Sequence, residues 1–343
     1  WDIHKGDTDS LCAMIDSGLD MAHEDFDGQY AGGYDYYSGD SNPNDTYGHG
    51  THVAGTVGAK TDNGIGVSGI GWNCRLLIYR AGNYTLPTTA IVNSINAARS
   101  AGALAISMSF GSSQQSSSIT SALTTANNAG VVCVAAAGND GVTSYHWPAA
   151  SAPVIAVASS NQQDGRSSFS NYGSWVEVAA PGEGILSTYD GNTYAWSDGT
   201  SMACPHVSGM AVILYSLLGG VRSKANADIV RAAIEDSCVP LSWVMHGRVD
   251  LNLAMNIISP PVQPSLYSVS PQQVEAFKGG NLTLTGANFQ SITKVTVDGY
   301  EITGHDIEVV SATEIKVPAP TAPNGLGQVQ VTVTNPGGTS NPS

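Results

Sequence analysis

Short apolar runs alternate with longer amphipathic stretches along most of the chain. A short apolar run bounded by turn residues is typical of a buried parallel strand, and a stretch with one apolar face is typical of a helix. The predicted strands are Leu11–Ile15, Arg75–Tyr79, Ala103–Met108, Val131–Ala135 and Val154–Ala158. The predicted helices are Thr88–Ser100, Ile119–Asn128, Met202–Leu218 and Ala227–Asp236, with Asp250–Ile258 as the closing segment. This alternation predicts an α/β fold with a doubly wound, mostly parallel sheet and helices on both faces.

The pattern changes after a proline-rich segment. Ser259–Pro264 contains three prolines, which stiffen it into an extended spacer. Beyond it, short alternating strands lie between Gly, Asn and Pro turns, at Asn281–Thr285, Lys294–Val297, Glu308–Val310, Glu314–Val317 and Gln328–Val333. This pattern predicts a small all-β sandwich of immunoglobulin type. The expected organisation is therefore a first domain over 1–258, a linker over 259–264 and a second domain over 265–343.

The composition argues against two classes of partner. Lys and Arg number 13 against 28 Asp and Glu, which gives a net charge of −15, whereas nucleic acids and anionic membranes require basic patches. Hydrophobic residues make up 42% of the chain, enough for a sizeable core. No apolar run reaches the ~18 residues of a membrane span, and the polar start Trp1–Lys5 lacks the pattern of a signal peptide. We therefore expect no nucleic-acid partner and no membrane span.

Three polar residues lie at the ends of predicted elements. Asp16 follows a buried strand, His49 lies in the glycine-rich Gly48–Gly55 at a loop-to-helix junction, and Ser201 lies at the start of Met202–Leu218. Each alone has an ordinary explanation, as a turn residue, a surface or core histidine and a helix cap. Together they supply an orienting carboxylate, a base and a nucleophile. The carboxyl ends of parallel strands meet at one sheet edge, so this edge can gather all three.

The order Asp16, His49, Ser201 with these flanking residues resembles the subtilisin-like serine proteases (subtilases), from about Leu11 to Ile258. The resemblance implies a serine endopeptidase in which Ser201 is the nucleophile, His49 the general base and then acid, and Asp16 the orienting carboxylate. It also implies that Asn139 donates its side-chain amide to the oxyanion, together with the Ser201 main-chain N–H. His52 is the competing base, and we interpret it and His206 as structural residues.

The resemblance further places the substrate as an extended strand beside Ser109–Gly111. The expected substrate-binding residues are Ser109, Phe110, Gly111, Ala137 and Gly138. By position, Ser109–Gly111 and Ala136–Asn139 form the walls of the primary specificity pocket, and His146 falls near its floor. No carboxylate is placed to demand Lys or Arg, so we expect protein or peptide substrates with an apolar or aromatic residue in this pocket.

Calcium is the expected cofactor. Thr61–Val67 resembles the calcium loop of the subtilases, with main-chain carbonyls of Thr61, Ile65 and Val67 joined by the Asn63 side chain and by Asp25. These are the oxygen ligands that a hard cation prefers. A simple Asn-Gly turn is the alternative interpretation. Between Asp16 and His49 the chain is acidic and rich in turn residues, and such a run is expected to form a solvated loop. Its aspartates are Asp25, Asp27, Asp35, Asp40 and Asp45.

Further expectations follow from the family. They are a secreted, processed, monomeric enzyme whose pro-segment acts as a cleaved inhibitor and folding aid, and a start shorter than is usual before the first core strand. Among five cysteines, at least one of which is unpaired, Cys12 and Cys74 are candidates for a disulfide if their strands are neighbours, and free buried thiols are the alternative.

The second domain resembles the IPT/TIG immunoglobulin-like modules at Ser270-Pro271, Gly286–Phe289 and Val333–Gly337. It carries no cluster of cysteines or histidines, so no chemistry is assigned to it. Two alternative functions remain for the whole chain. One is a subtilase tuned to transpeptidation, and the other is a binding protein with a degenerate protease domain.

Overall fold

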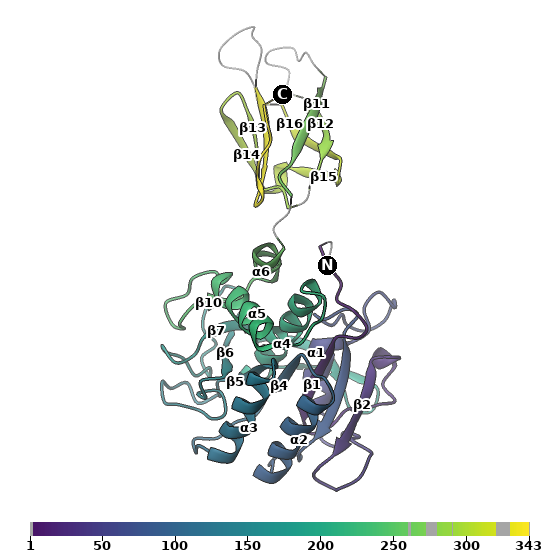
Figure 1. Cartoon of the computed structure of the whole chain (residues 1–343), viewed down its shortest axis with the longest axis vertical. Helices are drawn as coiled ribbons and strands as arrows, with labels where there is room; N and C mark the ends of the chain where they lie inside the picture. Colours follow the sequence, from purple (N-terminus) through teal and green to yellow (C-terminus); the bar gives the residue numbers. More distant parts are fainter. Residues whose placement is uncertain (1–2, 260–261, 272–279, 290, 320–329, 343) are drawn as a thin grey trace. The chain divides into compact units, whose positions relative to one another are not determined.

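The structure is a computed structural model that describes residues 3–259, 262–271, 280–289, 291–319 and 330–342. It divides into two compact units, Trp1–Ile258 and Ser259–Ser343 (Figure 1). Pro260 and Pro261 of the expected linker lie outside the described residues. No helix among the described residues is long and apolar enough to cross a membrane.

The first unit is built on a parallel sheet of eight strands in the order β10-β7-β6-β5-β4-β1-β3-β2. Every pair of neighbours in it runs parallel. The strands are β1 (Leu11–Asp16), β2 (Tyr30–Asp35), β3 (Arg75–Arg80), β4 (Ala105–Met108), β5 (Val132–Ala136), β6 (Val154–Ser160), β7 (Val178–Pro181) and β10 (Gly247–Arg248). The predicted α/β class is therefore confirmed, with β2, β7 and β10 as strands that the apolar pattern did not reveal.

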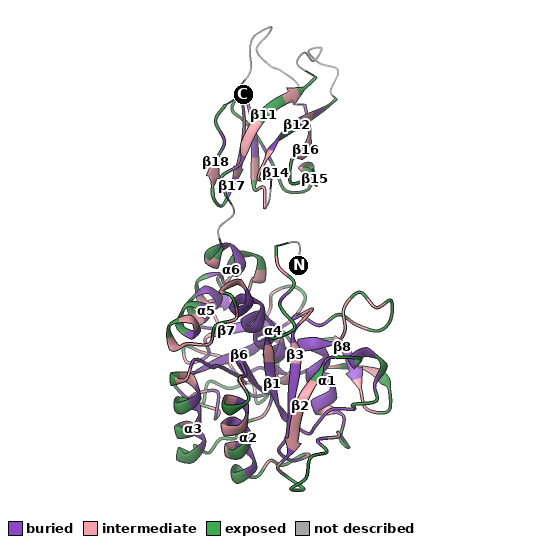
Figure 2. Cartoon of the chain, turned by 45° about the vertical axis from the view of Figure 1, so that its right-hand side comes forward, coloured by how far each residue is buried: buried purple, intermediate pink, exposed green. Residues whose placement is uncertain are grey.

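Helices cover both faces of this sheet (Figures 1 and 2). Successive strand residues point to opposite faces, so Met14 joins the core cluster of one face and Ile15 that of the other. One face packs against α1 (His49–Gly58), α4 (Thr200–Leu217), α5 (Lys224–Asp236) and α6 (Leu251–Ile258), and the other against α2 (Thr88–Ser100) and α3 (Ser117–Asn128). A two-stranded hairpin, β8 (Ile185–Tyr189) and β9 (Thr193–Ser197), precedes α4.

The run of five aspartates from Asp25 to Asp45 is only partly a solvated loop: Asp27 and Asp40 are exposed as expected, and the other three are buried. Asp25, Asp35 and Asp45 are 0%, 2% and 1% exposed. Asp35 forms an ion pair of 2.5 Å with Arg80, and the other two accept main-chain hydrogen bonds from loops and a helix end. Burial of a carboxylate requires such partners. The partners of Asp25 and Asp35 are remote in sequence, whereas those of Asp45 follow it directly along the chain.

The expected Cys12–Cys74 disulfide is wrong. All five cysteines are free thiols, four of them fully buried. The strands are neighbours, as expected, but Cys12 pairs in register with Leu76. Cys74 therefore lies two positions before the residue opposite Cys12, an offset of roughly 7 Å along the strand, which exceeds the reach of a disulfide. Burial raises the pKa of the Cys74 thiol to about 12.

The second unit is an antiparallel sandwich, which confirms the all-β prediction. Its two four-stranded sheets, ordered β11-β12-β16-β15 and β14-β13-β17-β18, share one apolar cluster that includes Leu284, Phe289 and Val333. The strands are β11 (Ser265–Ser270), β12 (Asn281–Ala287), β13 (Lys294–Val297), β14 (Tyr300–Thr303), β15 (Glu308–Ser311), β16 (Glu314–Pro318), β17 (Val331–Asn335) and β18 (Gly338–Thr339), with a short 3-10 helix, Gly304–Asp306, between β14 and β15. Residues 328–329 of the predicted Gln328–Val333 lie outside the described residues.

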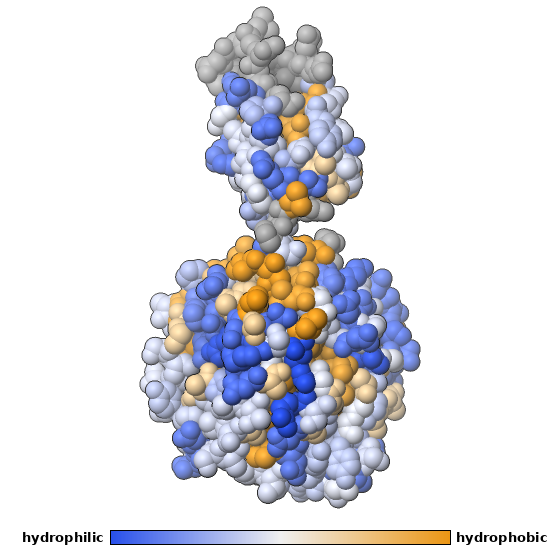
Figure 3. All heavy atoms as spheres, in the orientation of Figure 1, coloured by the Kyte–Doolittle hydropathy of each residue, from blue (hydrophilic) through white to orange (hydrophobic). Residues whose placement is uncertain are grey.

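The face shown in Figure 3 is mostly hydrophilic on the first unit, with apolar residues gathered where α6 lies. Leu253 and Ile257 of α6 are 44% and 49% exposed. Scattered exposed apolar residues are ordinary in folded proteins, so we assign this area no function.

Candidate active site

The parallel sheet brings Asp16, His49 and Ser201 to one edge. Asp16 is the last residue of β1, and His49 is the first residue of α1. Ser201 lies in the first turn of α4, whose N-cap is Gly199. The cap residue therefore lies two positions before Ser201, the residue that the sequence interpretation places at the cap. Because β1 lies in the middle of the sheet and α1 packs beside α4, side chains that start from three distant segments converge.

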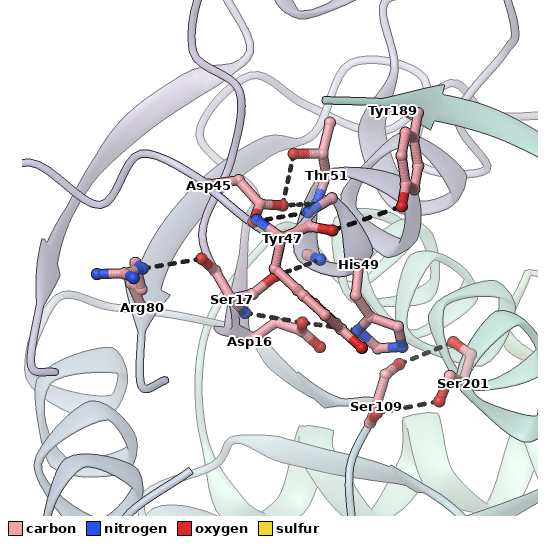
Figure 4. A network of polar contacts seen from close by, with 12 residues as sticks. Asp16, Ser17, Asp45, Tyr47, His49, Thr51, Arg80, Ser109, Tyr189 and Ser201 are labelled. Atoms are coloured by element: carbon pink, nitrogen blue, oxygen red, sulfur yellow. Dashed lines mark hydrogen bonds and ion pairs between the residues drawn. The ribbon is translucent and has the colours of Figure 1, made fainter. Parts of the chain in front are cut away.

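Asp16 and His49 are joined by a short hydrogen bond. Asp16 Oδ1 lies 2.7 Å from His49 Nδ1 and also accepts the Ser17 N–H at 2.7 Å. Burial disfavours the charged imidazole, but the charge and hydrogen bond of Asp16, with a contribution from Asp45, raise the pKa of His49 above its ordinary value. Figure 4 shows the ring between the Asp16 carboxylate and Ser201. The Asp16 bond thus leaves Nε2 as the nitrogen for proton exchange.

The N-terminus of α1 is held by residues that the sequence interpretation did not select. Asp45 Oδ1 accepts the N–H groups of Tyr47 and Gly48 at 2.9 and 3.0 Å. Its Oδ2 accepts the N–H and the hydroxyl of Thr51 at 2.8 and 2.7 Å (Figure 4). Burial opposes ionisation of Asp45, but these hydrogen bonds hold its pKa below the ordinary value. An Asp just before a helix start is the available sequence signal.

The hydroxyl of Ser201 is turned toward Ser109, which directly follows β4 (Ala105–Met108). Ser201 Oγ donates to the main-chain oxygen of Ser109 at 3.0 Å, and Ser109 Oγ donates to the main-chain oxygen of Ser201 at 2.8 Å. The nucleophile candidate is therefore next to His49 but bonded to Ser109. Loose nucleophile-to-base contacts are common without substrate.

Asn139 is held by its amide oxygen. Asn139 Oδ1 accepts both the N–H and the hydroxyl of Thr200, each at 2.9 Å, and the same hydroxyl accepts the Gly138 N–H at 3.1 Å. Because the oxygen is engaged, the orientation of the amide is fixed. Its nitrogen, which carries two donors, faces away from Thr200 and remains available to a ligand at the start of α4.

Two cavities flank this edge of the sheet. The larger, of about 470 Å³, is lined by Phe110, Gly111 and Trp147 along with residues of α2 and α3. The smaller, of about 190 Å³, is lined by Tyr47, His49, His52, Tyr189, Ser197 and Met202. The expected substrate segment Ser109–Gly111 therefore borders open space, and His49 faces a second opening on its other side.

His52 and His206 have internal partners. His52 is 1% exposed and its Nε2 lies 3.0 Å from the Ala195 oxygen, while His206 Nδ1 lies 2.9 Å from the Met202 oxygen. Burial lowers the pKa of both. A neutral, buried imidazole with a main-chain partner fits the structural role expected for each.

The residues expected to bind calcium are partly assembled. Asp25 Oδ1 accepts the Asn63 amide at 2.7 Å, and Oδ2 accepts the Val67 N–H at 2.8 Å. Asp25 is fully buried, yet no ion pair joins it to a cationic side chain within the described residues; Lys60 pairs with Asp27 instead. A buried carboxylate without a counter-charge is costly, and this favours a cation here. The Asn63 side-chain oxygen accepts the Ile65 N–H at 3.2 Å, so calcium binding requires the Asn63 amide to turn.

Comparison with known proteins identifies the chain. A model of the subtilase family, peptidase family S8, matches residues 7–255. The chain belongs to the subtilase family. Its second unit matches the IPT/TIG domain over residues 264–343. The first unit of this subtilase therefore falls in a family of serine endopeptidases.

The chain is similar to a serine proteinase, to thermitase and to a protease of solved structure. The thermophilic serine proteinase of Bacillus sp. (strain AK1) is 42% identical over 258 residues, which cover 73% of this subtilase and 62% of that protein. Thermitase of Thermoactinomyces vulgaris is 44% identical over 259 residues, 73% of this chain and 89% of thermitase. A protease structure from Pseudoalteromonas arctica aligns with a TM-score of 0.70 and 31% identity, covering 76% of this chain and 92% of that one.

Proposed function

We propose that this subtilase hydrolyses peptide bonds through Ser201, His49 and Asp16. The observation that carries the proposal is the 2.7 Å Asp16–His49 bond at the sheet edge where α4 presents Ser201. A serine hydroxyl is too weakly acidic to attack an amide unaided, so a base must take its proton in the transition state. His49 is that base, and Asp16 fixes its tautomer and stabilises the imidazolium.

The reaction begins when the Ser201 hydroxyl leaves the Ser109 oxygen and donates to His49 Nε2. Attack on the substrate carbonyl forms a tetrahedral adduct, and His49 then returns the proton to the leaving amine. Hydrolysis of the acyl-enzyme repeats these steps with water. The raised pKa of His49 matches this task, because the imidazolium must persist until the amine departs.

Asn139 and the Ser201 N–H bind the oxyanion in this proposal. The two hydrogen bonds from Thr200 to the Asn139 amide oxygen support this role, because they fix the orientation of the amide. A preorganised donor stabilises developing charge without reorganisation. A subtilisin is itself the reference case, in which removal of the oxyanion-hole asparagine lowers turnover by roughly 10²–10³-fold.

The substrate lies as an extended strand beside Ser109–Gly111, because added-strand pairing supplies main-chain bonds regardless of sequence. The side chain of the substrate residue that precedes the scissile bond enters between Ser109–Gly111 and Ala137–Gly138. An apolar or aromatic residue is the expected preference there. Phe110 is half-buried at the rim of the larger cavity, which provides apolar contact surface farther along the substrate.

Labelling with a fluorophosphonate tests the proposal. The expected adduct is on Ser201 and is absent from Ser201→Ala. A wild-type chain that stays unlabelled at Ser201 contradicts the hydrolase proposal and favours a binding protein with a degenerate protease domain. Product analysis with added amine nucleophiles separates hydrolysis from transpeptidation.

Calcium at Asp25 is a further part of the proposal. Thr61, Ile65 and Val67 would contribute main-chain oxygens and Asn63 its side-chain oxygen. The ion would supply the positive charge that the buried Asp25 lacks and would fix the loop to the core. Its role is structural, because these residues are outside the catalytic contacts.

The family resemblance also supports export, a cleaved pro-segment and a monomeric mature enzyme. Recovery of active mature chain from the culture medium of a producing cell, together with its mass in solution, tests these points. Active enzyme confined to the cell, or a stable dimer, contradicts them.

A further inference from the structure

The imidazole of His146 lies between the two segments expected to form the walls of the primary pocket. A Cβ added to Gly111 would overlap Cδ2 and Nε2 of His146, and a Cβ added to Gly138 would lie 2.9 Å from its Cγ. Non-bonded carbon atoms do not approach so closely. The ring is therefore packed directly against both main chains, and each wall needs glycine at the point of contact.

The gap that holds this ring is fixed in width. On one side, Ser112 and Trp147 exchange main-chain hydrogen bonds of 2.7 and 2.8 Å, which tie His146 to the wall. On the other side, Asn171 donates from its main chain to Gly138 and from its side chain to Ala137, both at 2.9 Å. Widening the gap requires breaking these hydrogen bonds, of which those of Asn171 are buried.

The same gap lies next to the nucleophile candidate. The wall residue Ser109 accepts the Ser201 hydroxyl at 3.0 Å, and Asn139, which follows Gly138, holds the start of α4. A substrate carbonyl placed on Ser201 therefore directs its own side chain between the walls. This step rests on the proposed function.

The ring of His146 is an uncharged obstacle rather than an ion-pair partner. Burial lowers its pKa, and Asp140, whose Oδ2 is 4.0 Å from Nδ1, opposes this only partly. Its side chain is 18% exposed, so most of the ring is already covered by protein. Displacing it exposes packed surface and separates it from both glycines.

We propose that His146 sets the depth of the primary pocket and restricts it to short apolar side chains, alanine in preference to phenylalanine or tyrosine. This narrows the broader apolar or aromatic expectation. A filled floor leaves room for a small side chain, and in an apolar pocket one methylene alone changes discrimination by roughly 10–200-fold.

The test compares tetrapeptide p-nitroanilides that differ only in the residue before the scissile bond. The readout is the ratio of kcat/KM for phenylalanine to that for alanine, in which any general loss of activity cancels. We expect a ratio below one for the wild type and a rise of roughly 10-fold or more in His146→Gly. His146→Ala, a smaller change with less risk to folding, should raise the ratio in the same direction.

His146→Phe is the matched control, because it keeps a flat ring at the floor and removes only the polar nitrogens. Its ratio should stay near that of the wild type. A wild type that cleaves the phenylalanine substrate better, or a ratio unchanged in His146→Gly with Ser201 still labelled, overturns the inference alone. Absence of fluorophosphonate labelling in the wild type overturns the proposed function and this inference with it.

Discussion

Asp45 accepts the main-chain N–H of Thr51 at 2.8 Å and thereby joins the acidic loop to the helix that begins at His49. The same carboxylate caps the helix start through Tyr47 and Gly48. One buried residue thus both positions the imidazole and contributes negative charge near it.

Asp45→Ala should lower stability by about 1–2 kcal/mol through loss of the cap. It should also move the acidic limb of the kcat/KM profile to lower pH, because removing an anion near His49 disfavours the imidazolium and lowers its pKa. Asp45→Asn keeps the size of the side chain and removes the charge, so it should show the same direction of pH shift. Asp27→Asn, at the exposed pair with Lys60, is the control for a distant charge. If the acidic limb of the profile does not move in either Asp45 variant, the charge of Asp45 does not raise the pKa of His49.

Ser201→Ala should abolish peptide hydrolysis and leave the fold intact, because a helix-start serine contributes only ~1 kcal/mol. His49→Ala should cost about as much, since triad members act as a unit. Turnover by the purified variants and their circular dichroism spectra are the measurements. If His52→Ala reduces turnover more than His49→Ala, the base is misassigned.

Asn139→Ala should reduce kcat by roughly 10²–10³-fold with little change in KM, because the amide binds charge that develops only in the transition state. Thr200→Val removes the hydroxyl that orients the amide but keeps the main-chain donor, so its loss should be smaller. Steady-state kinetics on one peptide substrate measure both. Equal losses in the two variants, or an effect confined to KM, speak against an oxyanion role.

A calcium chelator should lower the thermal midpoint of the first unit, because an ion that binds only the folded state stabilises it by mass action. Adding millimolar calcium should restore the midpoint. Asp25→Asn should lose the response to both reagents. Differential scanning calorimetry checks this, and a midpoint indifferent to chelator and calcium in the wild type contradicts the site.

Deletion of the second unit after Ile258 should leave hydrolysis of a small chromogenic peptide nearly unchanged, because the sandwich has its own apolar core and no assigned chemistry. On insoluble protein the truncated enzyme should be slower if the module is a weak binder, since tethering multiplies avidity by roughly 10²-fold or more. The measurement is the rate of hydrolysis of both substrates by the full-length and the truncated enzyme. An equal drop on the small peptide shows that the module stabilises the first unit instead.

Local patterning was enough for the five most apolar strands of the sheet and for the helices on its faces except α1. The amphipathic stretch Thr88–Ser100 forms α2 with the predicted bounds, and the alternating Lys294–Val297 forms β13 likewise. The signal was weaker where elements are short or polar. The hairpin β8–β9 is half-exposed and lacks a continuous apolar run, so no strand was predicted there.

The sequence by itself determined the fold class and the three candidate catalytic residues, because strand ends and helix starts are set by neighbours along the chain. Only the tertiary structure decided the partners across the chain: Asp35 with Arg80, the Ser201 hydroxyl on Ser109, and His146 between two glycines. The physical reason is that a buried polar group takes whichever partner the packed sheet brings near it. That choice depends on the three-dimensional register of segments far apart in sequence, which no local pattern records.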